Sequence, residues 1–458
     1  MAARDTIAAI ATGLGAAGVG VIRVSGAGAI AVATTVFRPR RGRPLAERRT
    51  HSAVYGWVLA PEGEPVDEAL ALVMRGPQSY TGEDVVELHG HGGQVALRRV
   101  LEVVVTAGAR LAEPGEFTRR AFMNGRMDLS QAEAVVDVIR AKTDRALKAA
   151  VGQLRGKFGD PVRAVRLQLL EAMAHLEADI DFPELELEVQ TRSQVTQTCR
   201  SGLARLEELL AGARQGRLLR DGLRVVLAGR PNVGKSSLMN RLVRENRSIV
   251  TEIPGTTRDV VEEWVGIDGL PVVLADTAGI RETAHPVERL GVDRSRATIE
   301  KADVVILVVD ATAGITAEDL EVVRVLPGDT IVIGVVNKCD AEPEFDLGEL
   351  VAVVPQAAVI RVSAVSGLGI ADLEAAIASC ARCADLEESF VANARQEESL
   401  RRAVGHLEAA LETADAGMGV DLVAIDIRSA WAALGEITGE TVGEDLLDQI
   451  FSRFCIGK

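Results

Sequence analysis

The sequence predicts a multidomain protein with α/β and all-α parts: an N-terminal α+β domain, a discontinuous helical domain, and a parallel α/β module inserted between the two halves of the helical domain. Two observations carry this prediction. Buried strands alternate with helices between residues 222 and 384, and helical periodicity surrounds that stretch on both sides. At 458 residues the chain also exceeds what one hydrophobic core serves, so several domains are expected.

The N-terminal domain is expected to span residues 1–122. Short β-branched runs, such as 20–24 and 69–74, lie between glycine and proline turns, which is typical of an α+β domain. From residue 128 to about 152, apolar residues recur at three- and four-residue spacing and predict one long amphipathic helix. The helical domain is therefore expected to comprise residues 123–221 and 385–458.

The inserted module is expected to span residues 222–384. Five apolar runs read as buried strands with helical patterns between them: 223–228, 272–275, 304–309, 331–336 and 359–362. This alternation predicts a parallel sheet covered by helices on both faces.

Composition indicates a globular protein of the cytoplasm. No apolar run is long enough to cross a membrane, and no signal peptide is recognisable. The net charge of −15 argues against a protein that binds nucleic acid over its whole surface, so any RNA contact must be local or shared with a partner. The five cysteines suggest a reducing compartment, and the lone pair Cys380 and Cys383 is interpreted as packing in preference to a metal site.

One local stretch is strongly basic. Six arginines lie between two apolar segments: Arg38, Arg40, Arg41, Arg43, Arg48 and Arg49. A solvated loop and an RNA contact would both account for this stretch, and we favour the solvated loop.

A phosphate-binding loop follows the first strand of the module. Residues 229–236 fit G-x-x-x-x-G-K-S between a predicted strand and a predicted helix. Glycines let backbone N–H groups wrap phosphates, Lys235 would reach the terminal phosphates, and Ser236 would ligate Mg²⁺. The predicted contacts are Asn232, Val233, Gly234, Lys235, Ser236 and Ser237.

Three further motifs end later strands. Asp276, Thr277, Ala278 and Gly279 can hold the Mg²⁺ shell and sense the γ-phosphate. In the motif formed by Asn337, Lys338, Cys339 and Asp340, the Asp340 carboxylate can accept two hydrogen bonds from guanine, which adenine cannot supply. Ser363, Ala364 and Val365 would support the guanine ring. These motifs predict a Ras-like P-loop GTPase domain that hydrolyses GTP.

A polar stretch between the first two motifs is expected to lie over the phosphates. Its candidate contacts are Thr251, Glu252, Ile253, Pro254, Gly255, Thr256 and Thr257. Thr257 is the candidate second Mg²⁺ ligand. Ile280 and Arg281 follow Gly279, so the glutamine that positions water in Ras-like GTPases is missing, and hydrolysis must be assisted differently.

Three regions together resemble the MnmE (TrmE) family of tRNA-modification GTPases. These are TGEDVVEL near the N-terminus, the GTPase motifs with TEIPGTTRDV, and the terminal FCIGK at residues 454–458. The resemblance runs essentially end to end. It implies a folate-binding N-terminal domain that also forms a homodimer, a helical domain and an inserted G domain.

The resemblance also implies how hydrolysis is assisted. In this family the G domains pair across the dimer with K⁺ at the phosphates, and the ion replaces an arginine finger. Asn232, Thr251, Ile253 and Thr256 would hold K⁺, the last three residues through backbone oxygens. Glu288 matches the family's acidic residue that orients the attacking water, whereas by itself it would be a solvated glutamate at a helix start.

Four residues match or adjoin the family's folate contacts. Arg23 and Glu87 match directly, Arg126 stands where the family usually has lysine, and Lys458 ends the tail that folds back toward the folate. The folate would be a 5-formyl- or 5,10-methylene-tetrahydrofolate. Cys455 is interpreted equally as a catalytic thiol or as a small apolar side chain in a docked tail.

The implied activity is GTP-driven modification of carbon 5 of the wobble uridine in certain tRNAs. The chain would act in a heterotetramer-type complex with the partner MnmG (GidA), which supplies FAD, and the product would carry an aminomethyl-type group. A regulatory GTPase switch that binds ribosomes or RNA without modifying chemistry shares every G motif and is the alternative. That alternative would not need the folate residues or the C-terminal tail.

Overall fold

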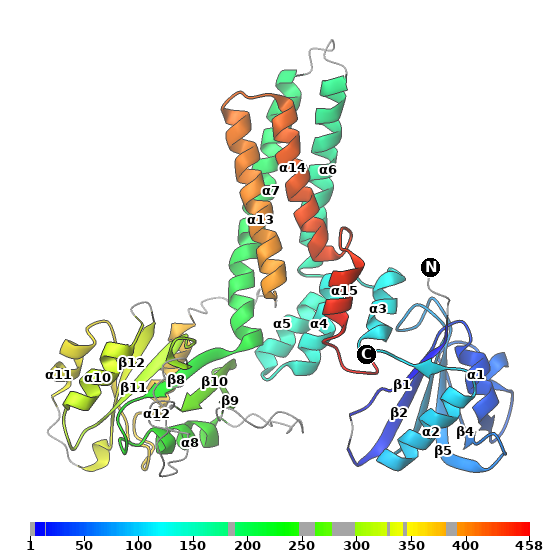
Figure 1. Ribbon diagram of the computed structural model, residues 1–458, viewed down its shortest axis with the longest axis horizontal. Coiled ribbons are helices and arrows are strands. Elements are labelled where there is room, and N and C mark those ends of the chain that lie inside the picture. Colours follow the sequence, from blue (N-terminus) through cyan, green and yellow to red (C-terminus); the bar gives the residue numbers. More distant parts are fainter. Residues whose placement is uncertain are drawn as a thin grey trace. The chain divides into compact units, whose positions relative to one another are not determined.

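The computed structural model describes most of the chain: residues 5–13, 15–181, 188–246, 262–276, 298–327, 330–341, 346–381 and 392–458, with the backbone alone for 179–181, 188–192, 214 and 215. The chain divides into two compact units, which are described separately (Figure 1). Unit 1 comprises Met1–Val136 and Trp431–Lys458, and unit 2 comprises Asp137–Ala430. The domain boundaries expected from the sequence stay predictions.

Unit 1 is built on a sheet with strand order β3-β4-β5-β6-β2-β1-β7. The strands are β1 (Ile7–Ile10), β2 (Ala17–Ser25), β3 (Phe37–Pro39), β4 (Ser52–Leu59), β5 (Pro65–Met74), β6 (Val85–Gly92) and β7 (Arg110–Leu111). Neighbouring strands are antiparallel except β1 and β7, which are parallel. The runs at 20–24 and 69–74 fall within β2 and β5, as predicted.

Helices cover one face of this sheet (Figure 1). The described helices that lie wholly within unit 1 are α1 (Ala29–Val36), η1 (Leu45–Glu47), α2 (Gln94–Thr106), α3 (Glu116–Met123) and α15 (Glu444–Phe451). Leu97, Val100 and Val104 of α2 pack with Val86 and Leu88 of β6 in the main core of the unit. Alternate residues on the strands therefore face away from this core, and among them Tyr55, Trp57 and Leu70 are exposed.

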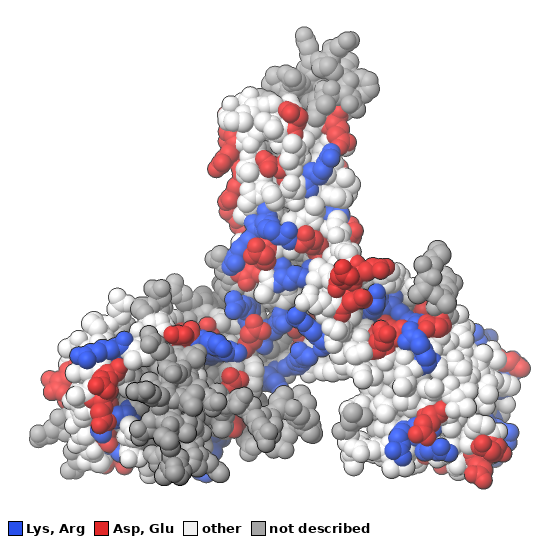
Figure 2. All heavy atoms as spheres, viewed as in Figure 1, with Lys and Arg blue, Asp and Glu red and all other residues white. Residues whose placement is uncertain are grey.

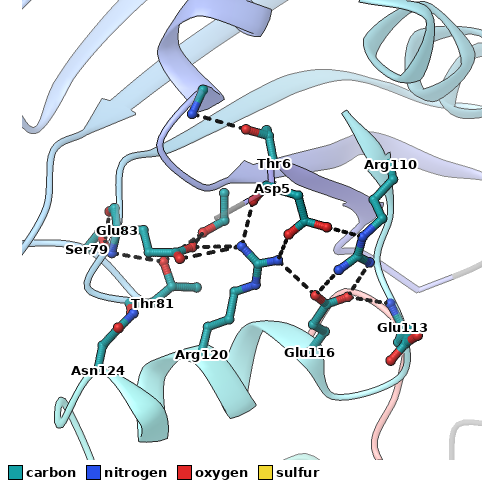
Figure 3. A network of polar contacts seen from close by, with 12 residues as sticks. Asp5, Thr6, Ser79, Thr81, Glu83, Arg110, Glu113, Glu116, Arg120 and Asn124 are labelled. Carbon is teal, nitrogen blue, oxygen red and sulfur yellow. Dashed lines mark hydrogen bonds and ion pairs between the residues drawn. The ribbon is translucent and has the colours of Figure 1, made fainter. Parts of the chain in front are cut away.

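An ion-pair network fixes α3 to the first residues of the described chain (Figure 3). Arg120 Nη2 lies 2.7 Å from Asp5 Oδ1 and 2.9 Å from Glu116 Oε1, and Arg120 Nη1 lies 3.2 Å from Glu83 Oε2. Arg110 Nη2 lies 2.6 Å from Glu116 Oε1. Burial would raise the pKa of Asp5 and Glu116, but hydrogen bonds from the two arginines hold each pKa below its ordinary value.

The predicted single helix over 128–152 is wrong, because the structure divides it into α4 (Leu129–Arg140) and α5 (Asp144–Leu154). Thr143 has an extended backbone, and its Oγ1 accepts a hydrogen bond from Ala146 N at 3.2 Å. An N-cap of this kind begins a new helix, although the apolar spacing continues across it. The apolar period alone could not reveal the break.

The helical part of unit 2 combines segments from both halves of the chain, as predicted. Its long helices are α6 (Gly159–Asp181), α7 (Glu188–Asp221), α13 (Ala394–Asp415) and α14 (Val420–Thr438), whose last residues belong to unit 1. Helix α7 packs against α6 and α13 (Figure 1). Arg428 Nη2 of α14 lies 2.9 Å from Glu177 Oε1 of α6.

The remainder of unit 2 is the inserted α/β module. Its strands are β8 (Leu223–Ala228), β9 (Glu262–Ile267), β10 (Leu270–Asp276), β11 (Val304–Asp310), β12 (Ile331–Asn337) and β13 (Ala358–Arg361). Its described helices are α8 (Lys235–Glu245), α10 (Ala317–Val325), η3 (Cys339–Ala341), α11 (Leu347–Val353) and α12 (Ile370–Cys380). The strand order is β13-β12-β11-β8-β10-β9. All five predicted strands are present and parallel, but the edge strand β9 is antiparallel to β10 and was not predicted.

Candidate functional site

The phosphate-binding loop connects β8 to α8, as predicted. Asn232 and Gly234 have positive φ angles of 63° and 97°, and Gly234 is the N-cap of α8. Lys235 Nζ donates to the backbone oxygens of Gly229 at 2.7 Å and Arg230 at 2.9 Å. The lysine therefore lies folded under its own loop, and burial lowers the pKa of its ammonium.

The two described candidates for the Mg²⁺ shell meet at the start of α8. Ser236 Oγ donates to Asp276 Oδ2 at 2.8 Å. Asp276 is the last residue of β10, and β10 pairs directly with β8, which leads into the loop. A hydroxyl and a carboxylate this close offer two oxygen ligands of the kind that Mg²⁺ prefers.

The end of β12 holds the phosphate loop from behind. Asn337 Nδ2 donates to Val233 O at 2.8 Å, and Asn337 Oδ1 accepts from Ala364 N at 3.2 Å. Lys338 Nζ donates to Asn232 O at 2.9 Å. The motif predicted to read the base thus also fixes the carbonyl groups of the loop, so the two motifs form one site.

Asp310 was not singled out by the sequence reasoning, although it ends β11 just as Asp276 ends β10. Lys338 Nζ lies 2.7 Å from Asp310 Oδ2. Burial would raise the pKa of Asp310, but hydrogen bonds from Lys338 and Thr312 hold the pKa below its ordinary value. The carboxylate therefore holds the Lys338 side chain in place beside the loop.

A second unpredicted contact joins the phosphate loop to α10. Arg230 Nε lies 3.4 Å from Asp319 Oδ2, and the two side chains are 19% and 2% exposed. Asp319 also completes a capping box with Thr316 at the start of α10. Among the described residues, Arg230 Nε and Nη2 have no hydrogen-bond partner. The ion pair with Asp319 is therefore the main interaction that offsets the cost of burying this guanidinium.

At the rim of the site, Asp340 and Val365 are exposed and Ser363 is buried. Several predicted residues lie outside the described part of the chain, and their placement stays untested: Thr251, Glu252, Ile253, Pro254, Gly255, Thr256, Thr257, Thr277, Ala278, Gly279 and Glu288.

In unit 1, the predicted folate residues Arg23 and Glu87 are partners across β2 and β6. Arg23 Nε lies 2.8 Å from Glu87 Oε1, and both side chains are largely buried. His89 Nε2 lies 3.2 Å from Glu87 Oε2. The pair therefore stands on the sheet face opposite the core, with a histidine beside it.

The C-terminal tail docks onto this pair. Arg23 Nη1 donates to Gly457 O at 3.2 Å. Gly457 has a φ of 92°, and a Cβ there would lie 2.3 Å from Ile10 O, so a side chain would not fit. Phe454 is buried and its ring centroid lies 5.2 Å from that of Phe451. Cys455, between these two anchors, is exposed.

Tyr80 was not predicted, although it directly precedes the TGEDVVEL segment. Three cations lie over its ring: Arg23 at 5.0 Å, Arg126 at 5.2 Å and Lys458 at 6.0 Å from the centroid. Tyr80 Oη and Thr118 Oγ1 are 2.9 Å apart. Burial and the nearby charge of Arg23 lower the pKa of Lys458. Arg23, Arg126 and Lys458 thus gather around one aromatic ring, beside the carboxylate of Glu87.

The remaining expectations concern metals and membranes. Among the described residues no group of three potential ligands could hold a metal ion, and Cys383 lies outside them. Cys380 Sγ donates to Ala376 O at 3.2 Å. No described helix is long and apolar enough to span a bilayer.

Family models and known proteins resemble the chain along its length. The model "MnmE helical domain" matches residues 129–455 and "GTP-binding protein TrmE N-terminus" matches residues 6–126. A relative from Symbiobacterium thermophilum, "tRNA modification GTPase MnmE", is 62% identical over 99% of both chains. A relative of the same name from Chloroflexus aurantiacus is 51% identical and covers 99% of this chain and 100% of its own.

Among solved structures, the G domain of the T. maritima FeoB iron transporter is 28% identical and covers 35% of this chain and 98% of its own, with a TM-score of 0.27. The helical-domain model spans well over half of the chain, and the relatives match it from end to end. The chain therefore belongs to the MnmE (TrmE) family of tRNA modification GTPases.

Proposed function

We propose that the chain uses GTP hydrolysis to control modification of carbon 5 of tRNA wobble uridines, with a one-carbon tetrahydrofolate as donor. Membership in this family makes it a GTP hydrolase with a role in tRNA modification. The observation that supports the finer proposal is the cluster of Arg23, Arg126 and Lys458 around Tyr80, with the C-terminal tail docked beside it. A GTPase switch without modifying chemistry would have no use for such a site.

For the nucleotide, the phosphate loop and the start of α8 supply backbone N–H groups, and Lys235 would exchange its bonds to Gly229 and Arg230 for the β- and γ-phosphates. Ser236 and Asp276 are already 2.8 Å apart, a fit for a shared Mg²⁺ shell, and Thr257 is the second expected Mg²⁺ ligand. Mg²⁺ would neutralise charge that develops on the phosphates. Asp340 would read guanine.

K⁺ is proposed as the second cation. Asn232 would take part in holding it, together with the backbone of Thr251, Ile253 and Thr256. Lys338 donates to the Asn232 carbonyl and so fixes the backbone of Asn232, whose side-chain oxygen would serve as the ligand. The positive charge would replace an arginine finger, and Glu288 would orient the attacking water.

The folate would bind at the cation cluster of unit 1. Its glutamate tail carries carboxylates that Arg126 and Lys458 can pair, and Glu87 can accept hydrogen bonds from the amidine edge of the pterin. Lys458 would bind through its ammonium, whose pKa burial and the nearby charge of Arg23 lower. The exposed thiol of Cys455 stands next to this cluster, which favours a role in the chemistry over apolar packing.

We further propose a cytoplasmic homodimer that acts on tRNA with the flavoprotein MnmG (GidA), which contributes FAD. The GTP cycle would shift the dimer between open and closed states, while the modifying chemistry occurs at the folate and flavin. In this scheme the G domain controls the conformation of the dimer, and the modifying chemistry takes place elsewhere.

Mass spectrometry of wobble uridines tests the proposal. In cells that lack the gene, we expect loss of the carbon-5 side chain and its return on complementation with the intact gene. Complementation with Arg23→Ala should fail, whereas Arg99→Ala, an exposed arginine of α2, should succeed. Purified Arg23→Ala should keep its GTPase rate. A modification profile unchanged by loss of the gene would favour the regulatory switch.

Deletion of residues 454–458 provides a second test. It should abolish tRNA modification and leave GTP turnover intact, because the tail docks on residues of unit 1, whereas the phosphate loop belongs to unit 2. Normal modification levels in the deletion strain would refute a chemical role of the tail.

A further inference from the structure

The loop between β3 and β4 is the most basic segment of an acidic protein. Residues 38–49 contain six arginines and one acidic residue, Glu47, in a chain whose net charge is −15. Electrostatic repulsion among so many cations must be offset by their surroundings. We therefore distinguish the arginines that hold the loop in its conformation from those that do not.

Two arginines hold the loop in one conformation. Arg48 Nε donates to Arg43 O at 3.0 Å and its Nη2 to Arg41 O at 3.4 Å. Arg75, from the end of β5, donates to Arg48 O at 3.1 Å and to Ala46 O at 2.7 Å. The loop is thus a fixed structure closed by side-chain bonds to its own backbone.

The other arginines point outward. Arg38, Arg41, Arg43 and Arg49 are exposed and, within the described part of the chain, none has a carboxylate within 4 Å. Arg40 differs from them, because its side chain interacts with Tyr55 and its Nη1 lies 3.7 Å from Glu68 Oε1. The fold therefore presents several guanidinium groups to solvent without balancing them.

Protection of a sheet edge explains only part of this arrangement. Strand β3 ends the sheet, and charged residues on an edge strand prevent pairing with other chains. That function concerns Arg38 and Arg40, which adjoin β4, but not Arg41, Arg43 and Arg49, which lie in the loop beyond the strand. The fixed loop needs another explanation.

We propose that this loop binds the phosphate backbone of the tRNA substrate, with Arg41, Arg43 and Arg49 as the contacts. A guanidinium presents a rigid fork that matches phosphate oxygens, and a loop fixed in advance loses little entropy on binding. The contact is independent of base sequence and supplies positioning for the modifying site. This inference rests on the proposed role in tRNA modification.

A second basic surface offers a matched control. In Figure 2, Lys and Arg side chains also gather where Figure 1 places α5. There Lys148, Arg155 and Lys157 are exposed, Asp144 and Asp160 flank them in the sequence, and Arg145 Nη2 lies 3.8 Å from Asp268 Oδ1. Cations flanked by acids and spread along a helix and the turn after it are expected to bind RNA less well than the loop.

The test compares tRNA binding by full-length chains in fluorescence anisotropy between about 50 and 200 mM KCl. The triple variant Arg41→Ala, Arg43→Ala, Arg49→Ala should bind at least about tenfold more weakly, with a log–log salt slope shallower by about 3. The corresponding Arg→Lys triple should recover most of the affinity, which excludes misfolding. Lys148→Ala, Arg155→Ala, Lys157→Ala should bind within about twofold of the unsubstituted chain.

GTPase rates should be equal in all four proteins. Equal loss of affinity in both alanine triples would show that the effect depends on net charge alone and would overturn the proposal. Undiminished tRNA binding by the loop triple would also overturn it. So would the absence of tRNA binding by the unsubstituted chain. Loss of flavoprotein binding with unchanged tRNA affinity would assign the loop to a protein partner instead. Wobble-uridine analysis in the deletion strain tests the proposed function separately, so the two can fail independently.

Discussion

The ion pair between Arg230 and Asp319 should restrain the phosphate loop from helix α10, and Asp319→Ala should loosen that loop. Asp319 Oδ2 accepts hydrogen bonds from Thr316 N and Oγ1 and lies 3.4 Å from Arg230 Nε. The two side chains are only 2% and 19% exposed. The substitution would leave a largely buried guanidinium without its counter-charge.

The expected size of the effect follows from this geometry. Removing one partner of a fully buried ion pair costs about 3 to 5 kcal/mol. Because Arg230 is 19% exposed and the contact is 3.4 Å, we expect about 2 kcal/mol for local opening of residues 229–234. Since about 1.4 kcal/mol corresponds to a factor of ten, amide exchange in the loop should accelerate roughly 30-fold.

Hydrogen exchange of the full-length chain, followed by mass spectrometry without nucleotide, measures this directly. Asp319→Asn keeps an acceptor for Thr316 but removes the charge, so the loop should exchange faster and the start of α10 should not. Glu318→Ala, an exposed neighbour on the same helix, is the matched control. If Asp319→Ala accelerates exchange at the start of α10 and leaves the loop at its original rate, the reasoning is refuted.

Three further predictions concern the ligands and pH. GTP turnover should rise severalfold in K⁺ over Na⁺, and Asn232→Ala should remove that difference; equal rates in both salts would exclude Asn232 as a K⁺ ligand. Folate affinity, measured by calorimetry, should fall about fivefold in Tyr80→Leu and little in Tyr80→Phe, since a stacked cation is stabilised by about 1 kcal/mol and only the first variant loses the ring. Asp5 and Glu116 have lowered pKa values, so their stabilisation is present at neutral pH and is lost as pH falls through those lowered values. Thermal unfolding of Asp5→Asn should therefore occur a few degrees lower than that of the unsubstituted chain at pH 7 and converge with it in acid, with a difference of about 1 kcal/mol or less because Asp5 is 40% exposed.

The α/β module shows how far sequence reasoning reaches. Each motif there ends a predicted strand, and the carboxyl ends of parallel strands meet at one edge of a sheet. The proximity of Ser236 to Asp276, and of Asn337 to the phosphate loop, could therefore be expected from motif order and strand prediction. Hydrophobic period and motif spacing are local properties of the sequence, and in this module they were sufficient to predict which residues lie close together.

The same reasoning was wrong at the junction of α4 and α5. The apolar spacing runs through residues 128–152, but Thr143 caps a new helix. Both one long helix and two short helices satisfy that spacing, and the choice depends on how each segment packs. A capping threonine within an apolar period was the signal that could have revealed the break.

By itself, then, the sequence determined the class of fold, the nucleotide motifs and the family. The family resemblance implied that the tail folds back toward Arg23 and Arg126, but only the tertiary structure showed the bond from Arg23 to Gly457, placed the three cations over Tyr80, and joined Arg230 to Asp319. These contacts link residues with no common period or motif, because antiparallel register, a docked tail and a buried ion pair are decided by the packing of distant segments. Local sequence pattern predicts the helices and strands, whereas the free energy of packing them against one another decides which side chains come into contact.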